Sequence, residues 1–197
     1  MKRRVRWDIR PGGVLLLALL YFFGDLQILA ALLGSIAVHE CGHVLALHRF
    51  GARVRRIRVD VTGFCMDFHG LRLTPGQECI SAAAGPLAGG LAAWLLSFLG
   101  NWYGSEFLML FAGTSLVLTM FNLIPAKPLD GWRMAAALFP NVAETVSLAA
   151  GSVTLFAGLW LMKAGYGPGL AVMGVILLLY DTVPEGRRSI KAERRVL

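Results

Sequence analysis

The chain has 197 residues, of which 56% are hydrophobic and 16% are charged, and its mean hydropathy is +0.63. A typical soluble domain has about 25% charged residues, so this composition excludes an ordinary soluble domain and indicates a small integral membrane protein. Three scattered cysteines indicate that the chain has no disulfide framework and no CxxC site. We expect one membrane domain over residues 1–197.

Six apolar segments in chain order are candidates for membrane-spanning helices, each of which needs about 20 mostly apolar residues. The first and the last are short, and local thinning of the bilayer can accommodate a short span. The basic start MKRRVRWDIRPGG could imitate a signal peptide, but no small-residue cleavage site follows it, so we interpret the first segment as a retained span. The expected fold is an all-α polytopic membrane protein with spans at residues 11–24, 27–50, 78–99, 107–124, 143–162 and 169–183.

The placement of lysine and arginine predicts the orientation of these spans. With six spans both termini lie on one side, which also receives the basic loop after the second span, whereas the other side receives only Lys163. The positive-inside rule then places both termini in the cytoplasm. We attribute the basic tails to topology and lipid contact rather than to nucleic-acid binding.

The loop between the second and third spans, residues 51–76, is too polar to cross a membrane. Its segment RVRRIRVDV alternates charged and branched apolar residues, which is typical of a strand, and a short hairpin with the following FCMDF segment is expected. The edge of such a hairpin can bind an extended peptide as an added strand. A hairpin that only connects two helices is an equal alternative. The candidate substrate-binding residues here are Arg55, Val59 and Val61.

The motif HECGH, from His39 to His43, lies inside the second apolar segment. On a helix the two histidines lie one turn apart on the same face, so they can share one tetrahedral metal. Glu40 lies about 100° around the helix from His39, where it can reach a water beside the metal but is poorly placed as a ligand. Zinc proteases use this spacing, with the glutamate taking a proton from water. The alternative is a pair of buried histidines hydrogen-bonded to neighbouring helices. In that case the carboxylate of Glu40 would lie unpaired inside the membrane, which is energetically unfavourable.

A catalytic zinc usually has three protein ligands, so a third is expected from a distant part of the chain. Asp130 is the leading candidate because it follows two prolines in FNLIPAKPLDGWR, which break the fourth span. Broken backbone at membrane depth is tolerated where it is buried in protein or lines a wet cavity. The alternative is that Asp130 caps a helix beginning near Gly131, with Asp181 or His48 as the next ligand to consider. Asn122, before the first proline, is placed to offer its amide to a substrate carbonyl.

HECGH in a membrane span, followed far downstream by NLIPAKPLDG, resembles the site-2 protease family of intramembrane zinc metalloproteases. The stretch SAAAGPLAGG in the third span is similar to the small-residue AGP stretch of that family. The resemblance implies one zinc per chain, bound by His39, His43 and Asp130. It also implies catalysis by Glu40 and support from Asn122.

The loop, the AGP helix and the C-terminal spans together are most similar to the sporulation branch of this family, the stage IV sporulation protein FB type, which processes a membrane-tethered pro-sigma factor. Gly85 and Pro86 of the AGP stretch are expected near the substrate, and Gly85 with Gly89 also forms a GxxxG pattern that favours close helix packing. Members of that branch carry a C-terminal CBS domain that senses nucleotide. This chain stops thirteen residues after Pro184, so we expect that regulation to be absent.

The sequence therefore predicts a zinc metalloendopeptidase of the bacterial cell membrane that hydrolyses peptide bonds of membrane-embedded or membrane-tethered proteins. A pro-sigma or anti-sigma factor, cut by regulated intramembrane proteolysis, is the kind of substrate implied. The expected partners are a membrane protein substrate and a membrane-embedded regulator, without nucleic acid, and the oligomeric state is left open. The alternative is a catalytically idle zinc-binding membrane protein that binds a client, but such a protein would not need Glu40.

Overall fold

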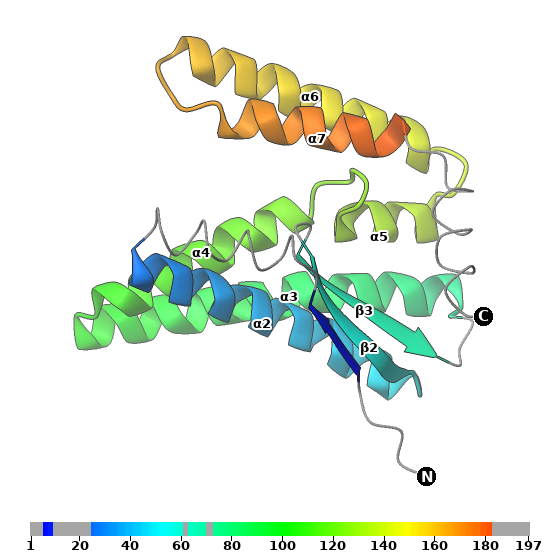
Figure 1. Cartoon of the computed structure of the whole chain (residues 1–197), viewed down its shortest axis with the longest axis horizontal. Coiled ribbons are helices and arrows are strands. Elements are labelled where there is room, and N and C mark those ends of the chain that lie inside the picture. Colours follow the sequence, from blue (N-terminus) through cyan, green and yellow to red (C-terminus); the bar gives the residue numbers. More distant parts are fainter. Residues whose placement is uncertain (1–5, 10–24, 61–62, 70–72, 183–197) are drawn as a thin grey trace. The chain divides into compact units, whose positions relative to one another are not determined.

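The computed structural model of the chain describes residues 6–9, 25–60, 63–69 and 73–182. The described residues fall into two compact units, Met1–Asn122 and Leu123–Leu197. The elements of the first are β1 (Arg6–Ile9), α2 (Leu26–Arg49), β2 (Arg53–Asp60), β3 (Gly63–His69), α3 (Pro75–Tyr103) and α4 (Glu106–Asn122). Those of the second are α5 (Asp130–Leu138), α6 (Ala143–Lys163) and α7 (Gly169–Thr182) (Figure 1).

Three of the described helices, α2, α3 and α6, are long and apolar enough to cross a membrane, and α4 and α7 are shorter apolar helices. Each of these five helices matches one predicted span to within four residues at either end. The first predicted span, residues 11–24, lies outside the described residues. The described part of the chain thus contains the helices expected of a membrane protein, whereas the count of six spans stays a prediction.

The ends of the two long helices in the first unit follow from local chemistry. The Asp25 carboxylate caps α2 by accepting a hydrogen bond from the backbone N–H of Gln27 at 2.8 Å. Thr74 and Gln77 form a reciprocal capping box at the start of α3, with proline in the first turn. α3 ends at Gly104, whose φ of 62° is the left-handed conformation that glycine adopts without a Cβ clash.

The helices of the first unit approach one another through small residues. A Cβ atom on Gly42 of α2 would contact the carbonyl oxygen of Ala84 in α3 and would lie 2.8 Å from the Cβ of Ala88. A Cβ on Gly34 would lie 2.6 Å from the Phe111 ring of α4. Because lipid supplies no hydrophobic drive between helices, such close contacts are what hold membrane helices together. They place the interior face of α2 directly against α3.

The strands of the first unit form a three-stranded sheet in the order β1-β2-β3 (Figure 1). β2 and β3 pair antiparallel, as the sequence predicts for a hairpin, and β1 pairs parallel with β2. β2 is therefore the central strand, and at Val59 it pairs with β1 on one side and with β3 on the other. This corrects the predicted docking position, because a peptide strand cannot be added where both edges are already paired. Arg55 lies at a register irregularity between β2 and β3, and Val61 lies outside the described residues.

In the second unit α6 and α7 run side by side as a helical hairpin (Figure 1). Glycines again permit the contact: a Cβ on Gly158 of α6 would touch the backbone of Ala171 in α7, and a Cβ on Gly174 of α7 would touch the backbone of Leu155 in α6. The short helix α5 precedes this hairpin and begins at Asp130. A helix beginning near Gly131 was expected only as an alternative to metal binding, and its presence does not exclude Asp130 as a ligand.

Candidate metal centre

The two histidines of HECGH lie one turn apart on the buried face of α2. His39 is 4% exposed and His43 is 7% exposed. Their Nε2 atoms are 3.2 Å apart, and the rings meet edge to face. Zn–N bonds of about 2.0–2.1 Å at a tetrahedral angle separate two nitrogen ligands by about 3.3 Å. The spacing of the two Nε2 atoms therefore fits two ligands of one zinc ion.

A backbone carbonyl of α3 orients the second histidine. The Nδ1 atom of His43 lies 2.7 Å from the carbonyl oxygen of Ser81. Because a carbonyl oxygen only accepts hydrogen bonds, Nδ1 carries the proton and donates it, which leaves the Nε2 lone pair of the neutral ring for a metal. Histidine ligands of metals are commonly oriented in this way. Sequence reasoning missed Ser81, and no sequence signal could have found it, because every residue has a carbonyl.

Gly85 of α3 leaves the space beside the two ligand atoms clear. A Cβ at this position would contact His43 Nε2 and would lie 2.8 Å from His39 Nε2. The two nitrogen donors and the space kept open by glycine fit a zinc ion. Glycine is therefore required at position 85 to avoid a clash with the histidine nitrogens, whereas the sequence predicted that Gly85 lies near the substrate. Pro86, the other predicted substrate residue of this stretch, is buried within α3, and its contact with substrate stays a prediction.

Gly89, one turn after Gly85, faces α4. A Cβ there would contact Thr119 Oγ1 and would lie 3.8 Å from His39 Nδ1. The two glycines of the GxxxG pattern thus serve different contacts, one with the histidine pair and one with α4. The sequence alone indicated only that helices approach closely along this face.

Three further predicted residues belong to the same unit. Glu40 is half-buried on α2 next to His39, as the motif requires, and its role as the base stays a prediction. Asn122 is the last residue of α4, and its amide Nδ2 donates to the carbonyl oxygen of Leu118 at 2.9 Å. A donation from this amide to substrate would have to replace that bond. His48 is exposed at the end of α2 and is not brought to the histidine pair.

Asp130 begins α5 in the second unit. Its Oδ1 atom is 3.2 Å from the guanidinium Nη1 of Arg133, one helical turn later. A Cβ on Gly131 would contact the carbonyl oxygen of Leu123, so the start of α5 packs tightly on the loop that precedes it. The Arg133 contact orients a carboxylate that the sequence assigns to the metal. The assignment of Asp130 as the third ligand remains a prediction.

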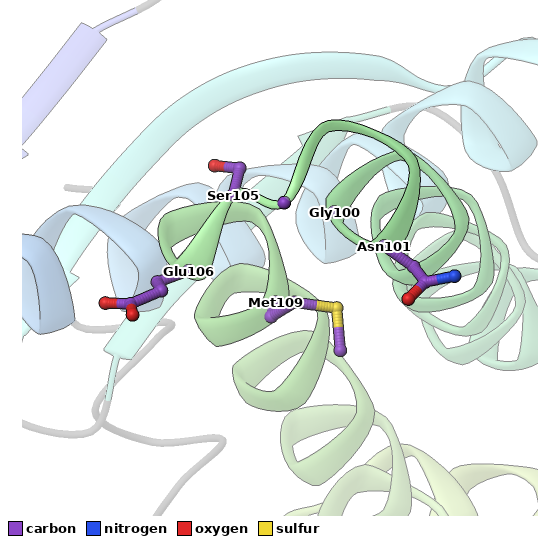
Figure 2. Close-up of a pocket in the computed structure, with 6 residues that line it drawn as sticks. Gly100, Asn101, Ser105, Glu106 and Met109 are labelled. Carbon is purple, nitrogen blue, oxygen red and sulfur yellow. The ribbon is translucent and has the colours of Figure 1, made fainter.

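A separate pocket lies at the turn between α3 and α4 (Figure 2). It begins 15 residues beyond Gly85 along α3, which corresponds to about 22 Å of helix. None of the predicted site residues lines it, so we assign it no part in the candidate metal centre. Its lining residues are Gly100, Asn101, Gly104, Ser105, Glu106 and Met109.

No family model matches the chain. The chain is 32% identical over 105 residues to a protein named as a zinc metalloprotease of Synechocystis sp., a match that covers 51% of this chain and 28% of that relative. It is 30% identical over 136 residues to stage IV sporulation protein FB of Bacillus subtilis, covering 66% of this chain and 46% of the relative. The chain thus spans less than half the length of both curated relatives.

The fold is similar to that of the site-2 protease from Methanocaldococcus jannaschii. The TM-score is 0.66 with 18% sequence identity, and the similarity covers 89% of this chain and 88% of the solved one. At this identity the likeness shows a shared fold.

Proposed function

We propose that this chain is a member of the site-2 protease family of intramembrane zinc metalloproteases and that it hydrolyses peptide bonds of membrane-embedded or membrane-tethered proteins. The observation that carries the proposal is the pair of buried Nε2 atoms 3.2 Å apart, with Glu40 next to His39 in the same helix turn. That helix, α2, is long and apolar enough to span a membrane.

In this proposal His39, His43 and Asp130 hold one zinc ion. When bound, zinc polarises the scissile carbonyl and makes water a nucleophile near neutral pH. The Ser81 carbonyl accepts a hydrogen bond from Nδ1 of His43 and so favours the tautomer whose Nε2 can bind zinc. The guanidinium of Arg133 likewise orients a proposed ligand, because its Nη1 makes a charge-assisted contact with Oδ1 of Asp130.

Glu40 performs the proton transfers of the proposed hydrolysis. Its carboxylate accepts a proton from the attacking water, whose oxygen forms a bond with the scissile carbonyl carbon. The carboxylic acid then gives that proton to the leaving amine as the C–N bond breaks, which restores the ionised base. Asn122 supports the substrate carbonyl by exchanging its bond to Leu118 for one to the substrate.

The substrate segment has to be extended when it is cut, because a helical peptide bond is shielded by its own hydrogen bonds. We place its docking edge on β3, since the side of β3 away from β2 has no partner among the described strands. The proposed substrate class is a membrane-tethered regulator such as a pro-sigma or anti-sigma factor, with a membrane-embedded protein as regulator. Both termini and the sheet lie in the cytoplasm, as the distribution of basic residues predicts.

The proposal is tested with the purified full chain reconstituted with a membrane-tethered candidate substrate. Cleavage should stop when a chelator removes zinc and should return when zinc is added back, because the reaction depends on the metal. A serine-protease inhibitor serves as the control and should leave cleavage unchanged. Cleavage that continues unchanged in metal-free protein would refute a metalloprotease.

A further inference from the structure

Lys127 is a buried cation in the loop that leads into Asp130, and the proposed hydrolysis does not use it. Its side chain is 6% exposed. The ammonium Nζ lies 3.2 Å from Glu144 Oε1 of α6 and 3.8 Å from Asp181 Oδ1 of α7. It also lies 5.1 Å from the centre of the Trp132 ring, which follows Asp130 in α5. A buried charge is stable only when it is well paired, so these contacts hold the lysine in one place.

Ser147 of α6 connects the backbone of Lys127 to the same carboxylate. Its hydroxyl accepts a hydrogen bond from the Lys127 backbone N–H at 2.9 Å and donates to both oxygens of Asp181 at 3.0 Å. Ser147 is fully buried, and the Asp181 side chain is 4% exposed. The main chain and the side chain of Lys127 are therefore both attached to the α6–α7 hairpin.

The carboxylate of Asp130 lies three residues after Lys127. The two helices of the α6–α7 hairpin, to which Lys127 is attached, are closely packed, because they come into backbone contact at Gly158 and Gly174. The loop between Lys127 and Asp130 is short, and the backbone N–H of Leu129 donates to the carbonyl of Ala126 at 2.9 Å. Three residues span at most about 10 Å, so a displacement of Lys127 is passed on to Asp130.

We propose that Lys127, together with Ser147 and Asp181, positions the Asp130 carboxylate for zinc by tying its loop to the α6–α7 hairpin. This inference rests on the proposed role of Asp130 as a zinc ligand. Loss of a group that orients a metal ligand typically weakens metal affinity about 10- to 100-fold. The Lys127 group is a positioning group, because none of its members is proposed to touch metal or substrate.

The test uses Lys127→Met in the purified full chain, which keeps an unbranched side chain one atom shorter and removes the charge. Zinc affinity measured by competition with a chelator should fall about 10- to 100-fold. Lys163→Met is the matched control, because Lys163 is exposed at the end of α6 and should leave the affinity unchanged. An affinity for Lys127→Met equal to that of the control overturns the inference.

A double variant separates positioning from folding. Lys127→Met leaves the buried carboxylate of Asp181 without its lysine partner, and adding Asp181→Asn removes that negative charge. The melting temperature of the double variant should therefore recover relative to Lys127→Met, while zinc affinity stays low. Recovery of both together means that the lysine acts only on stability and also overturns the inference.

The Asp130→Ala variant alone distinguishes the two proposals. If it weakens zinc binding while Lys127→Met does not, the positioning role fails and the ligand assignment stands. If Asp130→Ala binds zinc as the wild type does, the ligand assignment fails and the inference fails with it.

Discussion

Gly85→Ala adds a single methyl group at the point where the two histidine nitrogens converge. The new Cβ would contact His43 Nε2 and would lie 2.8 Å from His39 Nε2, which is inside van der Waals contact. The His43 ring cannot withdraw freely, because moving it breaks its 2.7 Å hydrogen bond to Ser81. Overpacking in a tight site costs about 1–3 kcal/mol, and a lost buried hydrogen bond costs about 1–3 kcal/mol.

Together these two costs are about 2–6 kcal/mol, which corresponds to zinc binding weakened about 30- to 20,000-fold at about 1.4 kcal/mol per tenfold. The assay is chelator competition on the purified protein. Gly90→Ala is the control, because a Cβ there meets only the Thr119 methyl group at 3.9 Å while the gain in helix propensity is the same. If Gly85→Ala binds zinc with wild-type affinity, the Nε2 atoms of His39 and His43 do not pack against Gly85 of α3 as described.

The remaining predictions concern ligands and topology. His39→Ala and His43→Ala should each lose zinc on elemental analysis, because two remaining protein ligands rarely hold it. His48→Ala is their control and should keep about one zinc per chain, since His48 is exposed; equal zinc in all three variants contradicts the assignment. Reporter fusions in the loop at residues 51–76 should report the cytoplasm and a fusion at Tyr103 the opposite side, as the lysine and arginine distribution requires. The same signal from both positions would show that the order of spans is wrong.

The sequence predicts those parts of the structure that depend on local spacing. Five of the described helices follow from continuous apolar segments, and the pairing of the HECGH histidines follows from the helical repeat. The strands β2 and β3 follow from alternation in one loop. In each case the residues that carry the signal are neighbours in the chain, so a pattern within one window is sufficient.

The parts that the sequence does not predict depend on contacts between distant segments. β1 is a four-residue segment, and its parallel pairing with β2 leaves no mark in RWDI, so the central position of β2 was missed. The Ser81 carbonyl orients His43 across two helices. Lys127 meets Asp181 from 54 positions away, and as a sequence feature it is only a lysine between two prolines. Such contacts are set by packing rather than by local pattern.

The central claim is that this chain is a protease whose base is Glu40, and Glu40→Gln tests it most directly. The amide keeps the size of the side chain but cannot accept the proton, and Glu40 is not a proposed ligand, so zinc content should equal that of the wild type. Cleavage of a co-expressed membrane-tethered substrate, followed by immunoblot beside the wild type, should fall about 10²- to 10⁴-fold. Cleavage by Glu40→Gln at the wild-type rate, with zinc bound, would contradict the account.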